Sequence, residues 1–252
     1  MSQKLTVIII TLNEEQNISE CLRCVEWADE IIVVDSFSTD KTVEIAKMFT
    51  DKVIQVEWKG YSAAKNYALQ LAQNDWVLSL DADERVMPEL AKEIQSILES
   101  AGESFEGYEV ARRAYFLGKW IRHCGWYPSY TIRLFKKSAG SFSNSLVHER
   151  LDLKGKMGRL KNDLLHYTDR NIFQYFEKFN RYTTLAADDM AGRGRKFIVT
   201  DIIFRPLFTF VKMYFIRGGW LDGLHGLILS VFSAAYVFTK YAKLWEFRNN
   251  KS

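Results

Sequence analysis

The chain has 252 residues, of which 48% are hydrophobic and 26% are charged. This length allows a sizeable core, and this hydrophobic fraction excludes a largely disordered protein. The net charge of +3 is divided unevenly: residues 190–252 hold ten Lys and Arg against three Asp and Glu, and the first 189 residues carry a net charge of −4. An acidic body with a basic tail favours an anionic surface as partner, and we expect no nucleic-acid partner.

Cysteine usage and the N-terminal segment both bear on the compartment. Cys21 and Cys24 form a CxxC pair, but no second pair of Cys or His completes a zinc site, so we interpret them as two residues of one helix. Three cysteines without evident pairing indicate a reducing compartment. The segment MSQKLTVIII lacks a charged leader region and a cleavage site, and it predicts a strand. We therefore expect a cytoplasmic protein.

Short apolar runs alternate with helical patterns along the first hundred residues. Strands that are apolar almost throughout are typical of a parallel sheet covered by helices on both faces, and the repeats predict right-handed crossovers. The expected strands are 5–10, 30–35, 52–56 and 75–80, with helices at 17–26, 42–49 and 63–72.

The remaining elements follow from local signals. Asn13 with Gln16 resembles a capping box, Ser62 is expected to cap the third helix, and Pro88 to open a helix that continues to Glu99. Further strands are expected at 107–116 and 130–135, a loop at 141–149 and a helix at 171–190. The sequence thus predicts an α/β catalytic domain over residues 1–170, with a mostly parallel sheet, and a helical, aromatic-rich extension over residues 171–252.

Polar residues follow each of the four predicted strands or open the helix after it. Because open α/β sheets bind ligands beyond the carboxyl ends of their strands, we expect these groups at one edge. The first group is TLNEE (11–15) and the second is DSFSTD (35–40). The Asp35 carboxylate is suited to a ribose hydroxyl or a base N–H; alternatively, Asp35 and Ser38 only cap the next helix.

The third group is GYSAAKN (60–66), a turn of small residues that opens a helix. Such a turn can approach a diphosphate closely, with Lys65 as a point charge. The alternative is that Lys65 lies on a solvated helix face.

The fourth group is LSLDADE (78–84), which places Asp81 and Asp83 directly after a buried strand. Two unneutralised carboxylates at this position are costly, but a divalent cation that bridges them to a diphosphate makes the arrangement favourable. Oxygen ligands of this kind suit Mg²⁺ or Mn²⁺. The alternative is an acidic turn that caps the helix at Pro88.

Together these segments resemble the family 2 inverting glycosyltransferases of GT-A (Rossmann-like) fold. The matching segments are VIIITLNEE, DEIIVVDSFSTDKT, GYSAAKNYAL and LSLDADE. In many relatives the second motif reads VDDGSTD, and here Ser36 and Phe37 replace the Asp-Gly pair. The resemblance implies that Asp35 contacts uracil or ribose, that Asp81 contacts the sugar nucleotide and that Asp83 holds the cation. The implied donor-binding residues are Thr11, Asn13, Glu14, Asp35, Lys65, Asn66 and Asp81.

The second half resembles a subgroup typified by lipopolysaccharide core β-1,4-glucosyltransferases. The matching segments are RLFK (133–136), LVHE (146–149), LHY (165–167), KFNRYT (178–183) and GGWLDG (218–223). The chain lacks the QxxRW motif of processive synthases, so a single transfer is expected. The resemblance implies a metal-dependent transfer of a hexose, such as glucose from UDP-glucose, to a glycolipid such as the lipopolysaccharide inner core.

An inverting transfer needs a carboxylate that deprotonates the acceptor hydroxyl and a cation that stabilises the leaving diphosphate. The Glu-Asp pair of many relatives is absent, and His148-Glu149 occupies its approximate place. Glu149 is therefore the candidate base, unless it only pairs with Arg150. The expected metal ligands are Asp81, Asp83 and His148. Acceptor phosphates are expected at Arg112, Arg133 and His166, unless the arginines are solvated surface charges.

The tail carries a membrane prediction. Residues 226–238 form an apolar run that is shorter than the roughly 20 residues a spanning helix requires. We therefore expect a helix in the interface at the cytoplasmic face of the membrane, or one packed against another protomer in a homo-oligomer. The alternative is that the tail aromatics complete the core. The basic residues expected to meet anionic lipid headgroups are Arg193, Arg195, Lys196, Arg205, Lys212 and Arg217.

Four other functions share some of these sequence features. A haloacid-dehalogenase-type phosphatase places DxD near the start of the chain, with Thr or Val where this chain has Arg85, so this class fits poorly. A sugar-nucleotide pyrophosphorylase needs a Gly-rich loop after the first strand, and this chain has TLNEEQN there. A polyprenyl-phosphate sugar transferase remains the alternative within glycosyltransferases. A non-catalytic, nucleotide-binding membrane adaptor remains the alternative outside them.

Overall fold

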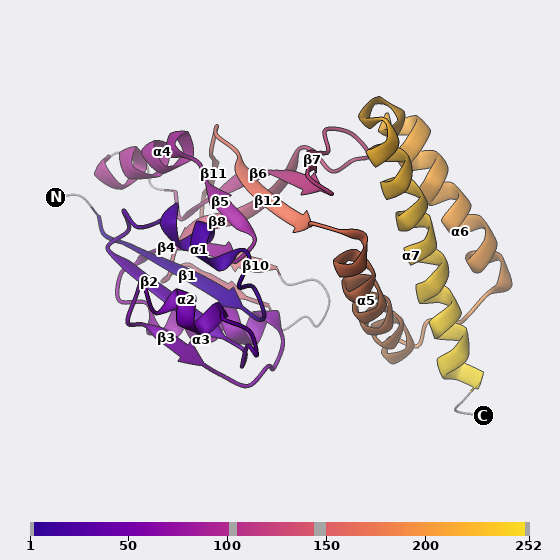
Figure 1. Cartoon of the computed structure of the whole chain (residues 1–252), viewed down its shortest axis with the longest axis horizontal. Coiled ribbons are helices and arrows are strands. Elements are labelled where there is room, and N and C mark those ends of the chain that lie inside the picture. The colour runs from indigo at the N-terminus through magenta and orange to yellow at the C-terminus, as the bar shows by residue number, and fades with distance from the viewer. Residues whose placement is uncertain (1–2, 101–104, 144–149, 250–252) are drawn as a thin grey trace. The chain divides into compact units, whose positions relative to one another are not determined.

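The computed structural model describes residues 3–100, 105–143 and 150–249. The chain forms two compact units, shown with their elements in Figure 1. Unit 1 comprises residues 1–112 and 130–166, and unit 2 comprises residues 113–129 and 167–252. Strands β6 (Gly107–Phe116) and β12 (Leu164–Asp169) each begin in unit 1 and end in unit 2.

Unit 1 is organised around parallel strands. They lie in the order β3 (Val53–Gln55), β2 (Glu30–Asp35), β1 (Leu5–Thr11) and β4 (Trp76–Asp81). The register pairs Thr11 with Asp35 and Ile10 with Asp81, so the carboxyl ends of the three long strands coincide. The chain crosses from one side of β1 to the other between β3 and β4, which creates a topological switch point beside β1.

The sheet continues beyond β4 with strands of mixed direction. The antiparallel strand β8 (Ser129–Lys136) pairs with β4, and β6, β12 and β5 (Glu84–Val86) follow in that order. The short strands β7 (Lys119–Trp120) and β11 (Met157–Arg159) pair with β6. Separately, β9 (Gly140–Phe142) pairs with β10 (Leu151–Leu153).

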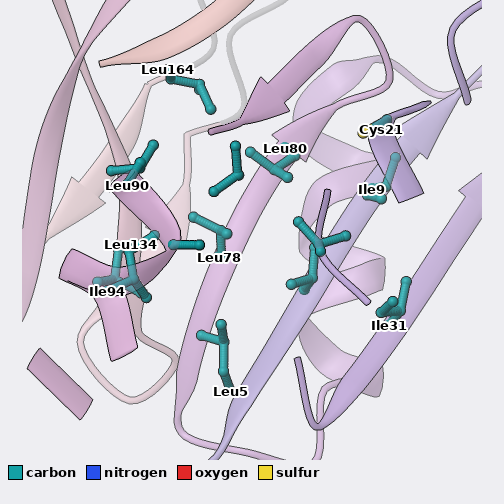
Figure 2. Packing of buried hydrophobic residues seen from close by; sticks show 14 of the residues in the cluster. Leu5, Ile9, Cys21, Ile31, Leu78, Leu80, Leu90, Ile94, Leu134 and Leu164 are labelled. Carbon is teal, nitrogen blue, oxygen red and sulfur yellow. The ribbon is translucent and has the colours of Figure 1, made fainter. Parts of the chain in front are cut away.

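Helices cover both faces of the parallel strands. Side chains of β1 alternate, with Leu5 and Ile9 in one apolar cluster and Ile8 and Ile10 in the other. The first cluster, drawn in Figure 2, also contains residues of α1 (Ile18–Arg23) and α4 (Pro88–Glu99). The second contains residues of α3 (Tyr61–Leu71). Two buried faces explain why the strands are apolar almost throughout, as predicted.

Several local predictions need correction. Asn13 does not cap α1, because the helix begins one turn later and Asn17 is its N-cap. Ser62 does not cap α3, because Gly60 takes the N-cap position with φ +101°, a conformation that suits glycine. The predicted loop at 141–149 begins inside β9, and its residues 144–149 lie outside the described residues.

Unit 2 is mainly helical. Its helices are α5 (Ile172–Gly192), α6 (Val199–Val211) and α7 (Leu224–Asn249), with a π-helical turn at Lys212–Ile216 and a 3₁₀ turn at Gly219–Asp222 between the last two. Both α5 and α6 pack against α7, and α6 runs beside α7 in Figure 1.

Helix α7 is longer than its apolar run. It spans 26 residues and is long and apolar enough to cross a membrane by length and composition. The sequence predicted an apolar segment over residues 226–238, too short to span a membrane. The helix that contains it is longer than this segment, because it continues through Lys240 and Lys243. A core helix of a soluble protein passes the same criteria, so length does not distinguish a span from an interfacial helix.

The GGWLDG segment is explained by close packing in unit 2. A Cβ at Gly226 would lie 1.9 Å from the backbone oxygen of Gly219, so α7 can approach the preceding turn only without a side chain there. Gly218 and Gly223 have positive φ values on either side of the 3₁₀ turn.

We predict that Gly226→Ala destabilises the protein by about 1–3 kcal/mol, because the new methyl group overlaps a backbone carbonyl. Gly192→Ala is the matched control, since a Cβ there meets nothing within 4 Å. It should be neutral or stabilising by up to about 1 kcal/mol. Thermal unfolding followed by circular dichroism measures both; equal melting temperatures for the two variants would contradict the packing argument.

Candidate functional site

Asp81 lies at the centre of a cluster of charges at the carboxyl edge of the sheet. Lys65 of α3 approaches one carboxylate oxygen (Nζ–Oδ1 2.8 Å) and Arg133 of β8 donates to the other (Nη2–Oδ2 2.5 Å). The Asp81 side chain is 28% exposed, whereas that of Lys65 is 1% exposed. Burial opposes ionisation, but the two cations outweigh it and hold the pKa of Asp81 well below its usual range.

Glu84 is the second anion of this cluster and is fully buried. Its Oε1 accepts from the same Arg133 nitrogen at 2.6 Å, and its Oε2 accepts the backbone N–H of Asp81 at 3.0 Å. Arg112 lies 4.0 Å from Oε1. Glu84 therefore fixes the turn that carries Asp81 and Asp83, and sequence reasoning assigned it no role.

Asp83 faces a histidine. The distance from Asp83 Oδ1 to His166 Nε2 is 3.5 Å, and the antiparallel register of β5 and β12 creates this contact by pairing Glu84 with His166. Burial would lower the pKa of His166, but the Asp83 carboxylate outweighs burial and raises it.

The loops after β1 and β2 are joined by hydrogen bonds. Asp35 is buried and accepts from the backbone N–H and the hydroxyl of Ser38 and, at 3.1 Å, from the Gln55 amide. Ser38 in turn accepts the backbone N–H of Asn13 at 2.8 Å, and the Asn13 side-chain oxygen accepts the N–H of Thr39. In this structure Asp35 orders the loop after β2. It does not cap the next helix, α2 (Thr42–Ala46), whose N-cap is Lys41.

Further contacts of the same kind complete this junction. The backbone N–H of Glu14 donates to the Thr42 hydroxyl at 2.8 Å, and Asp40 receives the N–H groups of Glu15 and Thr42. The hydroxyl of Thr11 is buried, with no hydrogen-bond partner in the described part of the chain. The segment 11–15 is therefore held rigidly beside the end of β1.

Asn66 has a structural contact next to Lys65. Its amide donates to the backbone oxygen of Phe142 at 2.8 Å and accepts the Phe142 N–H at 2.9 Å, so it binds strand β9 through both polar groups. The Phe142 ring lies 5.6 Å from Lys65 Nζ. Helix α3 thus contacts both Asp81 and the strand that leads toward residues 144–149.

The structure brings six of the predicted residues close together. The six are Lys65, Asp81, Asp83, Arg112, Arg133 and His166, gathered around Glu84. Lys65 and Arg133 are buried, which excludes the solvated alternative for both. His148 and Glu149 lie outside the described residues.

Sequence reasoning also missed the role of Arg85. Its guanidinium is buried and donates to the backbone oxygens of Ala82, Glu84 and Asn17, at 2.8–3.0 Å, which ties the turn after β4 to the start of α1. An arginine inside a short buried strand was the available signal. Among the described residues, no group of three or more His, Cys, Asp or Glu is arranged to hold a metal ion, and all three cysteines are free thiols.

An open α/β sheet with a switch point and a charged cluster at its carboxyl edge defines a class of proteins that bind ligands at that edge. A family model for glycosyl transferase family 2 matches residues 6–151. The chain therefore belongs to glycosyl transferase family 2, as its motifs predicted.

Known proteins agree with this assignment. Over 249 residues the chain is 31% identical to the lipopolysaccharide core biosynthesis glycosyltransferase LpsC of Rhizobium meliloti, covering 96% of this chain and 92% of that protein. It is 33% identical to an uncharacterized glycosyltransferase of Rickettsia typhi, covering 97% and 87%. The mannosyltransferase PcManGT of Pyrobaculum calidifontis, solved with GDP-Man and Mn²⁺, has a TM-score of 0.57 at 16% identity, covering 97% and 88%. The fold is the predicted GT-A fold.

We predict that Asp81→Asn destabilises the protein by about 2 kcal/mol at neutral pH, because it removes the charge that Lys65 and Arg133 bind. The lowered pKa of Asp81 means that this stabilisation is present above the pKa of the unfolded chain and is lost as the pH falls through the folded-state value. The difference between wild type and variant should therefore shrink in acid.

Urea unfolding at neutral and acidic pH measures this difference. Asp152→Asn in β10 is the control, because its side chain is exposed, and it should change stability by less than about 0.5 kcal/mol. A variant as stable as wild type at neutral pH would show that the charge cluster contributes nothing to folding.

Proposed function

We propose that the chain is an inverting transferase that moves a hexose, such as glucose from UDP-glucose, onto a glycolipid such as the lipopolysaccharide inner core. The observation that carries this proposal is the position of Asp81 and Asp83, at the carboxyl edge beside the switch point, among buried cations. The name of the Rhizobium meliloti relative supports an acceptor in the lipopolysaccharide core.

The donor diphosphate is assigned to the cluster around Asp81. Lys65 is a buried cation at the start of a helix, where an approaching diphosphate meets both its charge and the helix N-terminus. Asp81 keeps Lys65 and Arg133 in place, and a sugar hydroxyl is a suitable partner for its exposed edge. The nucleoside is assigned to Thr11, Asn13 and Glu14, with Asp35 ordering the loop beside it.

A divalent cation, Mg²⁺ or Mn²⁺, fits the donor set at Asp83. Mg²⁺ is usually held by one or two protein carboxylates together with substrate phosphates, so a preformed cage of ligands is not required. Asp83 and the neighbouring imidazole of His166 are the proposed protein ligands, with His148 as a further one, while Asp81 is engaged by two cations. When bound, the cation stabilises negative charge on the leaving diphosphate.

Glu149 is the proposed base that removes the acceptor hydroxyl proton. The strand β9 that precedes its segment is bound through Phe142 to Asn66, next to the proposed diphosphate ligand Lys65. Asn66 is therefore a positioning residue in this proposal, not a direct donor ligand. Arg112 is the proposed contact for acceptor phosphates. His166 is assigned to the cation site beside Asp83 instead, and Arg133 is already bound to Asp81 and Glu84.

Residues 171–252 are proposed to hold the protein at the cytoplasmic face of the membrane, as a peripheral protein. One face of α6 is apolar and exposed along its whole length, a pattern typical of helices that lie in the lipid interface. Arg195 and Arg205 pair with Asp201, and Arg193 pairs with Asp189. Of the predicted cations, Lys196, Lys212 and Arg217 are therefore the stronger candidates for lipid headgroups. A homo-oligomer through the same face is the alternative. The exposed residues are Val199, Ile203, Phe204, Leu207, Phe208 and Val211.

We predict that wild type binds UDP and UDP-glucose in a metal-dependent manner and that Asp83→Ala loses this dependence, because the proposed cation ligand is gone. Isothermal calorimetry with and without Mn²⁺ measures both. Asp152→Ala, an exposed carboxylate in β10, is the control and should bind as wild type does. Absence of binding by wild type would require a different donor base, to be sought among GDP- and CMP-sugars.

We further predict that Glu149→Gln abolishes transfer while donor affinity changes by less than about twofold. The amide cannot accept the acceptor proton, and the residue has no proposed contact with the nucleotide. Release of UDP in the presence of acceptor measures turnover, and calorimetry measures binding. Preserved turnover would remove Glu149 from the mechanism.

A further inference from the structure

Unit 2 contains a cavity of about 370 Å³ that the proposed transfer does not use. Basic and aromatic residues from the segment after β6 form one wall, and the turn before α7 forms the other. The lining residues are Lys119, Trp120, Arg122, His123, Leu221 and Asp222.

A tight hairpin positions the first wall. Leu117 and Gly118 both have positive φ values, +50° and +80°, as a two-residue turn of type I′ requires. The turn pairs β7 with the end of β6, with Trp120 opposite Tyr115. Lys119 and Trp120 are therefore fixed by backbone pairing.

Asp222 joins the two walls through hydrogen bonds of its carboxylate and of its backbone oxygen. It is buried and accepts the backbone N–H of His123 at 2.8 Å, its Oδ1 lies 3.1 Å from His123 Nδ1, and its backbone oxygen accepts from Lys119 Nζ at 2.8 Å. The lining thus contains two cations, Lys119 and Arg122, and one carboxylate, Asp222. The cavity carries an excess of positive charge.

Arg122 is held in a form suited to an anion. Its guanidinium lies over the Trp120 ring, 4.4 Å from the centroid, and Arg113 lies over the same ring at 4.8 Å. A guanidinium stacked in this way keeps its planar edge of N–H donors ordered, which favours bidentate binding of phosphate. The Trp120 indole N–H is buried and has no acceptor within the ranges that the structure describes.

An apolar rim lies next to these cations along the chain. Trp220 is 56% exposed and Leu221 is 53% exposed, and Phe215, Ile216 and Leu224 are also exposed. A soluble phosphate would gain nothing from such a rim. A lipid presents a phosphate and acyl chains together, which matches a cationic cavity bordered by exposed aromatic and aliphatic side chains.

We infer that this cavity receives the phosphate of a membrane lipid headgroup, with Lys119 and Arg122 as its ligands and Trp220 and Leu221 in contact with the acyl region. The inference rests on the proposed membrane association of residues 171–252 and adds a specific headgroup site to it.

The test is co-sedimentation with vesicles of phosphatidylcholine alone or with one part in four phosphatidic acid. The double variant Lys119→Ala/Arg122→Ala should bind phosphatidic acid vesicles about thirtyfold more weakly than wild type, through the loss of two cationic contacts. Its residual binding to phosphatidylcholine should equal that of wild type. Arg122→Lys, which keeps the charge but not the planar fork, should fall between them. The matched control Lys154→Ala/Lys156→Ala removes two exposed lysines of unit 1 and should bind as wild type does.

The outcomes separate the proposals. Equal binding of wild type and the pocket variant would overturn the headgroup site and leave membrane association standing. No binding of wild type to either vesicle would overturn both, and the calorimetric test of donor binding would be unaffected. Calorimetry with glycerol 3-phosphate tests whether a soluble phosphate is enough. An affinity equal to that for vesicles would assign the cavity to a soluble phosphate and overturn the lipid inference.

Discussion

A single buried guanidinium holds the carboxyl edge of the sheet together. The same nitrogen of Arg133 contacts Asp81 and the fully buried Glu84, so two anions that would repel each other share one cation. Removing one member of such a group would leave an uncompensated charge in a region of low dielectric, which is costly. Because Arg133 comes from the antiparallel strand β8, the parallel half of the sheet cannot complete this edge without the strands that follow it.

The need for β8 at this edge marks the limit of what the sequence could predict. The parallel strands and their order of appearance follow from apolar runs. Both β2 and β6 have the predicted bounds, and in β2 a Val- and Ile-rich run lies between Glu30 and Asp35. The cluster at the edge was predicted as separate motifs. The pairing of Arg133 with Glu84 joins residues 49 positions apart, and no periodicity encodes it. The caps of α1 and α3 were missed because the backbone of the preceding turns, not the side chains, sets where those helices begin.

Two motifs that resembled a subgroup now have local explanations. Asn180 and Thr183, in the KFNRYT segment, accept hydrogen bonds from Lys243, which joins α5 to α7. In GGWLDG, Gly219 allows close packing and Asp222 anchors the segment after β7. Both motifs therefore maintain the helical unit, and a similarity of sequence in this region indicates a shared scaffold before it indicates a shared substrate.

Lys65 and Asn66 are neighbours on α3, yet they bind different parts of unit 1. Lys65 contacts Asp81 at the end of β4, and the Asn66 amide forms two hydrogen bonds with the backbone of Phe142 in β9. Consecutive residues of a helix cannot move independently, so a small rotation of α3 would shift both contacts together. Helix α3 thus couples the end of β4 to strand β9. A ligand that displaced Lys65 would also shift the contact between Asn66 and Phe142.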